Sequence, residues 1–267
     1  MAKQDLKRLG SSYMYDVFSD TSNVTLVVTS CGRFDLLKKT LESFLQYNTY
    51  PIKSVIITED SGDRTVFEYI PEVMKSKAEV IVNSPKLGQI KSIDLAYSKV
   101  ETEYVFHCED DWEFYRPGFI EDSIRIMEGD SNILQVWLRS FQHDIMVHSP
   151  YHFLGERKLL DGLAYYQVGS NKKDWQGFSF NPGIKRISDY QKIGSYSSFS
   201  SEKGISKHCA ELGFYAVILE NDAIMHIGFD SHVEGIREKS KKRRRRFKDS
   251  FKQALIFLGG FLLGWLL

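Results

Sequence analysis

The sequence predicts an α/β fold, with a mostly parallel sheet flanked by helices and a basic and apolar tail at the C-terminus. Short apolar runs rich in β-branched residues alternate with helical segments between residues 24 and 115. Such runs are typical of strands buried on both faces, as in a parallel sheet. With 42% hydrophobic and 26% charged residues, a chain of 267 residues has enough apolar side chain for one sizeable domain.

The predicted strands cover residues 24–29, 54–58, 78–82 and 104–108. Helices are expected from Asp35 to about residue 48, around residues 67–73, and over residues 87–98, where apolar residues recur at helical spacing. Right-handed crossovers would align the strands and gather the loops at residues 30–33, 59–63 and 109–113 at the carboxyl edge of the sheet. Ligands of open α/β sheets bind along that edge.

After residue 115 the alternation weakens. We expect a helix near residues 119–127, a strand near 133–138, a helix from about residue 205 and a strand over 216–219, with another short apolar segment at 225–228. The aromatic and polar stretch at residues 141–166 has no clear period, so its structure is left open.

Charge and cysteine content exclude little. The 35 Lys+Arg balance the 35 Asp+Glu, so net charge indicates no partner, and a nucleic-acid partner is not expected. Cys31, Cys108 and Cys209 are widely spaced and form neither a disulfide framework nor a zinc motif, which favours a reducing cytosol. No apolar signal segment precedes residue 20, so the predicted domain is expected to remain inside the cell.

The strongest motif is the acidic triplet Glu109-Asp110-Asp111 at the end of the fourth predicted strand. Adjacent carboxylates beside an apolar strand repel one another and are desolvated, which is costly unless a cation or several donors compensate. Mg²⁺ and Mn²⁺ prefer such oxygen ligands and share them with phosphate oxygens. The alternative is an acidic turn in solvent, and Trp112 and Phe114 directly after the acids make that less favourable.

Four segments in order resemble the nucleotide-binding motifs of GT-A glycosyltransferases, a Rossmann-like fold, especially those of family 2. They are Thr29-Ser30-Cys31-Gly32-Arg33, Glu59-Asp60-Ser61-Gly62-Asp63, Leu87-Gly88-Gln89-Ile90-Lys91 with Asp94, and Glu109-Asp110-Asp111-Trp112. The resemblance covers residues 24 to about 230. It implies that Asp60 contacts the base, that Asp111 binds the metal, and that the nucleotide sugar is also bordered by Thr29, Ser30, Arg33, Gln89, Lys91 and Asp110.

Later segments extend the resemblance. Ser201-Glu202-Lys203, a helix and Gly213-Phe214 resemble the motif that carries the catalytic base, which implies this role for Glu202, although the family usually has aspartate there. A helix-capping glutamate is the alternative. His226 resembles the late histidine that completes a metal or diphosphate site, and a structural histidine is the alternative. Acceptor contacts are expected from Trp112, from Trp175 and from Asn181 in an Asn-Pro-Gly turn, for which an ordinary turn is the alternative. Trp175 and Trp137 could stack on sugar faces, and buried packing, the commoner fate of tryptophans, is the alternative for both.

The tail is expected to attach to a membrane. As a helix, residues 254–267 would reach about 21 Å, short of the roughly 30 Å of a bilayer core. The basic run Lys241 to Arg246 precedes it, and an apolar segment beside a polybasic one favours an anionic membrane face. A nucleic-acid-binding tail and an oligomerising helix are the alternatives.

Together these features predict a lead-in at residues 1–22, a nucleotide-sugar-binding half at 23–115, an acceptor-binding half at 116–235 and a membrane-associating tail at 236–267. The predicted reaction is metal-dependent transfer of a sugar, with inversion, from a UDP- or GDP-type donor to a saccharide or lipid-linked acceptor. Mn²⁺ or Mg²⁺ is the expected cofactor, and the inner face of the cytoplasmic membrane the expected location. The alternatives are a sugar-phosphate nucleotidyltransferase and a membrane-tethered nucleotide-sugar-binding protein without activity.

Overall fold

The computed structural model describes residues 17–174 and 177–229. Most of the predicted lead-in, Trp175 and the predicted tail lie outside the described residues. Within them, no helix is long and apolar enough to cross a membrane.

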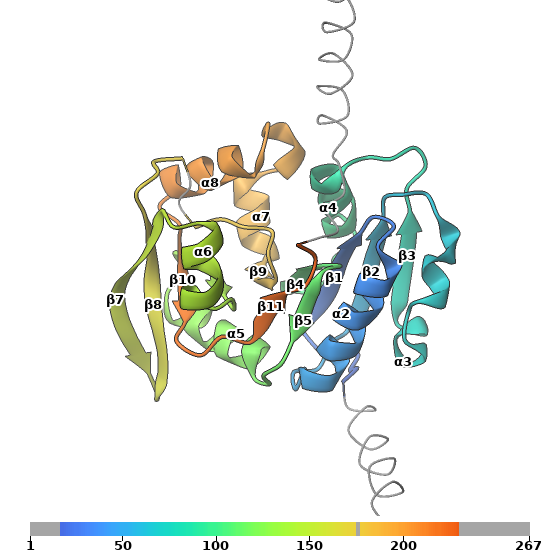
Figure 1. Ribbon diagram of the computed structural model, residues 1–267, viewed down its shortest axis with the longest axis horizontal. Coiled ribbons are helices and arrows are strands. Elements are labelled where there is room, and N and C mark those ends of the chain that lie inside the picture. The colour runs from blue at the N-terminus through green and yellow to red at the C-terminus, as the bar shows by residue number, and fades with distance from the viewer. Residues whose placement is uncertain (1–16, 175–176, 230–267) are drawn as a thin grey trace, which may run out of the picture. The chain divides into compact units, whose positions relative to one another are not determined.

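The central sheet has the strand order β3-β2-β1-β4-β9, and its first four strands run parallel (Figure 1). The antiparallel strand β9 extends the sheet at β4. Because β1 lies in the middle, every one of its residues is buried, as its run of β-branched and apolar residues predicts. The strands of this sheet are β1 (Val24–Ser30), β2 (Ser54–Glu59), β3 (Ala78–Val82), β4 (Tyr104–Glu109) and β9 (Gly183–Arg186).

Helices cover both faces of this sheet. On one face α2 (Phe34–Tyr47) and α5 (Phe119–Gly129) bury apolar side chains against alternate residues of β1 and β4. On the other face α4 (Gln89–Tyr97), α7 (Ile187–Ile193) and α8 (Glu202–Glu211) pack against the remaining alternate residues. Successive strand residues point to opposite faces, so one apolar strand supplies two cores. The β2–β3 connection holds a 3₁₀ turn, η1 (Arg64–Glu68), and the short helix α3 (Glu72–Lys75), where the sequence predicted one helix.

The second half of the described chain builds two smaller sheets. One has the order β6-β10-β8-β7, and the other pairs β11 with β5 in antiparallel fashion. The stretch at residues 141–166, whose structure the sequence does not predict, forms a π-helical turn, a short helix and most of a β-hairpin. The remaining elements are β5 (Trp112–Phe114), β6 (Ile133–Trp137), η2 (Phe141–Ile145), α6 (Met146–His148), β7 (His152–Leu160), β8 (Leu163–Ser170), η3 (Tyr196–Ser198), β10 (Tyr215–Leu219) and β11 (Ile224–His226).

The predicted α/β fold with a mostly parallel sheet is confirmed. Each of the four strands predicted before residue 110 is present within one residue of its expected bounds. The strand predicted at residues 216–219 is β10, and the segment at 225–228 contributes β11.

Candidate functional site

The predicted loops meet because three parallel strands end in register. Ser30 at the end of β1 pairs with Glu59 at the end of β2, and Thr29 pairs with Glu109 at the end of β4. The turns at residues 30–33, 59–63 and 109–111 therefore leave the sheet at the same edge, where ligands of such sheets bind.

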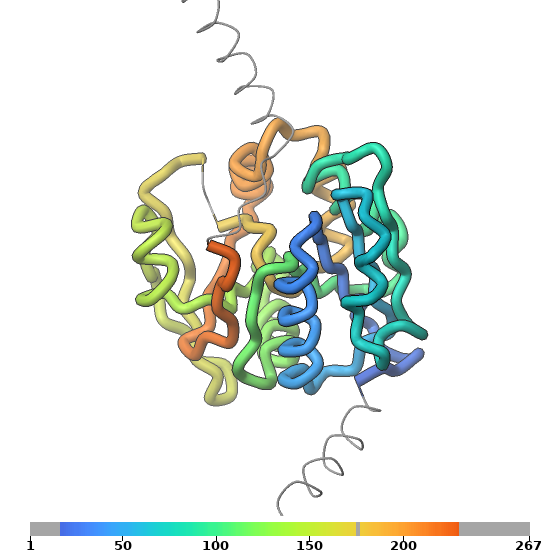
Figure 2. The backbone as a smooth tube through the Cα atoms, turned by 45° about the vertical axis from the view of Figure 1, so that its right-hand side comes forward, coloured from blue at the N-terminus to red at the C-terminus, as the bar shows by residue number. Residues whose placement is uncertain are grey.

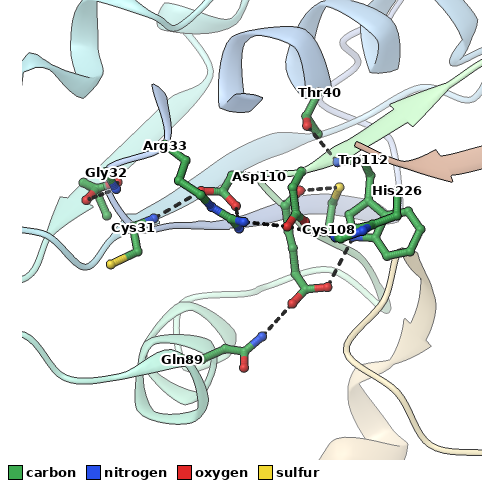
Figure 3. A network of polar contacts seen from close by, with 12 residues as sticks. Cys31, Gly32, Arg33, Thr40, Gln89, Cys108, Asp110, Trp112 and His226 are labelled. Carbon is green, nitrogen blue, oxygen red and sulfur yellow. Dashed lines mark hydrogen bonds and ion pairs between the residues drawn. The ribbon is translucent and has the colours of Figure 1, made fainter. Parts of the chain in front are cut away.

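Arg33 joins the last two acids of the triplet (Figure 3). Its Nη2 pairs with Asp110 Oδ1, and its Nη1 lies 2.7 Å from Asp111 Oδ2. Asp110 also accepts a hydrogen bond from the Cys31 backbone N–H at 3.3 Å. A guanidinium presents several donors in a planar fork, so one side chain can hold both carboxylates.

His226, which comes near the end of the described residues, contacts the Asp111 carboxylate. Its Nε2 lies 3.0 Å from Asp111 Oδ2. The antiparallel pairing of β11 with β5 sets His226 opposite Trp112, and the Ile227 backbone N–H donates to the Asp111 carbonyl at 2.9 Å. Figure 2 shows this segment, in red, returning beside the strand that follows the triplet. The structure thus brings together the two side chains predicted to bind metal.

The electrostatics of the two aspartates differ. Burial raises the pKa of Asp110 to about 6, against the opposing effect of Arg33. Burial also acts on Asp111, but hydrogen bonding to His226 and the charge of Arg33 hold its pKa below the ordinary value. From the sequence, these desolvated acids are expected to need a cation or several donors in compensation. Arg33 supplies part of that compensation, so desolvation alone does not demand a metal.

Glu109 is held separately from the two aspartates. Its carboxylate accepts hydrogen bonds from Gln89 Nε2 at 2.7 Å and from Trp112 Nε1 at 3.3 Å. Burial of the carboxylate, with the negative charges of Asp111 and Glu202, raises the pKa of Glu109 to about 7. The triplet is thus divided, with Glu109 facing α4 and the aspartates facing Arg33.

Asp60 fastens the loop that leads into α4. Its Oδ1 accepts from the Leu87 backbone N–H at 2.7 Å and from Asn83 Nδ2 at 3.0 Å, and its Oδ2 accepts from the Gly88 backbone N–H at 2.8 Å. The residue is 4% exposed, and Ser92 Oγ lies 3.3 Å from Oδ1. Both carboxylate oxygens are therefore bound by the protein itself, which gives Asp60 a structural role.

Glu202 begins α8 and lies partly buried beside the predicted acceptor turn. Its Oε1 accepts a hydrogen bond from the Phe180 backbone N–H at 3.0 Å, and the neighbouring Asn181 backbone N–H donates to Ser179 Oγ at 3.1 Å. Burial raises the pKa of Glu202, opposed by the Phe180 and Ser179 hydrogen bonds and the charges of Lys185 and Arg139. The helix cap is Ser201, so Glu202 is not the capping glutamate of the alternative reading.

The remaining predicted site residues have varied surroundings. Thr29 and Ser30 are buried at the end of β1, whereas Lys91 is exposed on the first turn of α4. Trp112 is 2% exposed and packs between the His226 ring and the Arg139 guanidinium, which differs from the expectation of a ring that contacts the acceptor. Trp137 is buried and donates to the Gly177 carbonyl at 3.0 Å, the commoner fate of such residues.

Comparisons with known proteins identify the family of the chain. A family model described as glycosyl transferase family 2 matches residues 25–185, more than half of the chain. The chain belongs to glycosyl transferase family 2. The family resemblance and the GT-A-like fold predicted from the sequence are therefore confirmed. No curated protein sequence matches this family 2 chain.

Solved structures share its fold. S. aureus TarS 1-349 is similar with a TM-score of 0.54 and 14% identity, covering 76% of this chain and 60% of that one. The mannosyltransferase PcManGT from Pyrobaculum calidifontis, in complex with GDP-Man and Mn²⁺, has a TM-score of 0.55 and 11% identity, covering 82% of this chain and 62% of that one. GalNAc-T7 with UDP, GalNAc and Mn²⁺ has a TM-score of 0.53 and 11% identity, covering 76% and 43%. This family 2 chain thus spans less than two thirds of each.

The donor atoms of this family 2 site suit a divalent ion shared with a substrate. No group of three or more His, Cys, Asp or Glu side chains that could hold a metal occurs among the described residues. A carboxylate oxygen of Asp111 and an imidazole nitrogen of His226 do converge at 3.0 Å. Mn²⁺ accepts both ligand types, and two protein ligands are enough where diphosphate oxygens complete the coordination.

Three polar residues near the site of this family 2 chain were not predicted from sequence. Arg139 follows β6, forms a two-pronged pair with Asp144 and lies over the Trp112 ring. Lys185 on β9 and His107 on β4 are buried inside the domain. Arg139 could have been noticed as the first polar residue after a buried strand. A lysine and a histidine within strands give no such signal, because only the sheet register shows what they face.

Proposed function

We propose that this family 2 chain is a metal-dependent glycosyltransferase that moves a sugar, with inversion, from a nucleoside-diphosphate sugar to a saccharide or lipid-linked acceptor. The observation that carries the proposal is the convergence of Asp111, His226 and Arg33 at the carboxyl edge of the sheet, with Glu202 near enough for its charge to act on Glu109. Structures of similar fold hold GDP-Man or UDP together with Mn²⁺, which supports a donor of this class.

Arg33 is assigned to the donor diphosphate. Its guanidinium lies at the loop after β1 and already binds carboxylates, and the same fork geometry suits phosphate oxygens. Asp111 and His226 would hold the Mn²⁺ or Mg²⁺. The ion, when bound, neutralises the charge that develops on the departing diphosphate.

Glu202 is assigned as the general base. It takes the proton of the acceptor hydroxyl as that oxygen attacks the anomeric carbon and the nucleoside diphosphate leaves from the opposite face. The Phe180 backbone N–H fixes one carboxylate oxygen, which orients the other. Phe180 belongs to the turn at residues 179–181, so Asn181, the next residue, is assigned to the acceptor side of the site.

The chain's other predicted properties belong to the same proposal. Residues 23–115 bind the donor, and residues 116–235 bind the acceptor. The segment 236–267, with its basic run and apolar end, attaches the enzyme to the inner face of the cytoplasmic membrane. Attachment there would suit a lipid-linked acceptor.

A panel of UDP- and GDP-sugars with Mn²⁺ tests the activity. The proposal expects a free nucleoside diphosphate and a glycosylated acceptor. Pyrophosphate release would instead indicate a nucleotidyltransferase, and binding without any product a non-catalytic module; either result contradicts the proposal.

Glu202→Gln tests the base. Turnover should fall by about 10²- to 10⁴-fold, the usual contribution of a general base, while donor binding by calorimetry is retained. Glu211→Gln is the matched control, because this exposed residue lies at the other end of the same helix. Unchanged turnover in Glu202→Gln would remove Glu202 from the mechanism.

A further inference from the structure

Lys185 is a fully buried lysine in the middle of β9. It is 2% exposed, and its ammonium has no hydrogen-bond or ion-pair partner among the described residues. An unpaired buried ammonium costs stability, and an apolar side chain of similar volume would cost less. Such a group therefore calls for a functional explanation.

The sheet register shows where Lys185 points. It pairs with Val105 of β4, and Gly183 pairs with His107, so Lys185, Val105 and His107 share one face. Val105 belongs to the apolar core that also contains Ile205 of α8. The Lys185 side chain thus extends into the layer between the sheet and the helix that carries Glu202.

A chain of contacts leads from this face to Glu202. The His107 ring lies 6.0 Å from the Phe180 ring, centroid to centroid, and the Phe180 backbone N–H holds Glu202 Oε1. The positive charge of Lys185 opposes the burial that raises the pKa of Glu202. The charge of Glu202 is in turn the largest of the charges that oppose the lowering of the Lys185 pKa by burial.

The other cations nearby are already engaged. Arg139 forms its two-pronged pair with Asp144, and Arg186, next to Lys185 in the strand, pairs with Asp189 and with the Met127 carbonyl. Among the described residues around Glu202, Lys185 is thus the cation without a carboxylate partner of its own.

We propose that Lys185 is a positioning residue that keeps Glu202 a charged carboxylate, directed at the acceptor hydroxyl. This inference rests on the proposed role of Glu202 as the base. Lys185 touches no substrate and acts through space on Glu202, in an interior where such interactions are screened far less than in water.

The remaining groups around Lys185 do not replace it. Burial lowers the pKa of Lys185 to about 8, so the ammonium persists at neutral pH. From β4, burial holds the pKa of His107 well below its ordinary value and that of Cys108 well above, so both are neutral. Cys209 of α8 is neutral for the same reason. Glu109 is the other carboxylate that Lys185 faces, and it is bound by Gln89 and Trp112.

Lys185→Met tests the proposal, because it removes the charge and keeps the length of the side chain. The acid limb of the kcat/KM profile against pH should move up by about one pH unit, since a nearby opposite charge lowers a carboxyl pKa by at least that much. At pH values well below this limb, turnover should fall about tenfold. Thermal stability should be unchanged or higher, because a costly buried charge has been replaced.

Two further variants define the result. Lys185→Arg keeps the charge and should leave the acid limb in place. Lys192→Met, on the exposed side of α7, is the control for the loss of an ordinary lysine and should leave the acid limb where it is. If Lys185→Met yields no soluble protein, Lys185→Gln is measured in its place with the same expected shift.

An unmoved acid limb in Lys185→Met overturns the inference, and a lower Tm with an unmoved limb assigns Lys185 a structural role. Comparison with Glu202→Gln separates the two proposals. If Glu202→Gln is fully active, the assignment of the base fails. If Glu202→Gln is inactive and the Lys185→Met limb is unmoved, only the role of Lys185 fails.

Discussion

Asp60→Ala should destabilise the domain strongly, because Asp60 fastens the loop before α4. The substitution removes the acceptor for the Leu87 and Gly88 backbone N–H groups and for the buried Asn83 amide. An unsatisfied buried donor costs about 1–3 kcal/mol, and the two backbone donors are only partly buried. We expect a loss of about 3 kcal/mol, which lowers Tm by about 6–12 °C in a domain of this size.

Urea unfolding followed by circular dichroism measures this loss. Asp63→Ala is the matched control: it removes one exposed acceptor, for the Thr65 backbone N–H, and should cost about 1 kcal/mol or less. If Asp60→Ala stayed within about 1 kcal/mol of wild type yet lost nucleotide binding, Asp60 would be a ligand contact, as the family resemblance implies, and the structural role argued here would be wrong.

Asp94, Gly228 and His152 each allow a further prediction. Asp94→Asn should cost about 2–3 kcal/mol and speed amide hydrogen exchange at Ser197, because Asp94 accepts from that backbone N–H at 2.8 Å and from three other donors. Gly228→Ala should weaken Mn²⁺-dependent nucleotide binding at least tenfold by calorimetry, since a Cβ there would lie 2.5 Å from Asp111 Oδ2 and 2.6 Å from Asp111 Cβ. The same overpacking should lower stability by about 1–3 kcal/mol. Burial lowers the pKa of His152 to about 4, so below about pH 6.5 the unfolded chain takes up a proton that the folded chain does not. Stability should therefore fall from about pH 6.5 towards pH 4, and less so in His152→Phe.

Each of these predictions has a control and a contradicting result. Asp20→Asn affects an exposed pair and should leave stability unchanged; equal losses in the two aspartate variants would refute the role of Asp94. Gly204→Ala is the control for Gly228→Ala, because a Cβ added at Gly204 would have its nearest neighbouring atom 3.7 Å away. Equal binding in both glycine variants would refute the close approach to Asp111. Identical pH curves for His152→Phe and wild type would show that His152 does not titrate as argued.

The sheet and its edge could be predicted because their signals are local. A short run rich in β-branched and apolar residues, such as that of β1, specifies a buried strand, and parallel strands must deliver their following loops to one edge. The meeting of Asp111 with Arg33 follows from this topology. The meeting with His226 does not, because it depends on the antiparallel pairing of β11 with β5.

The hydrogen-bond partners of the acidic residues could not be predicted. Nothing local distinguishes Asp60, whose oxygens are taken by backbone N–H groups, from an aspartate that faces a ligand. The burial of Lys185 is equally invisible, since one register shift would turn its side chain to the other face. The hairpin at residues 152–170 was missed because its strands are only partly buried and lack a clean alternation.

Calorimetric titration of UDP and GDP in the presence of Mn²⁺ tests the central claim most directly. Wild-type protein should bind one of the two nucleotides in a manner that chelation of the metal abolishes. Asp111→Ala should lose this metal-dependent binding, whereas Glu113→Ala, exposed on the next strand, should retain it. Undiminished Mn²⁺-dependent binding by Asp111→Ala would contradict the assignment of the sheet edge as a metal and nucleotide-sugar site.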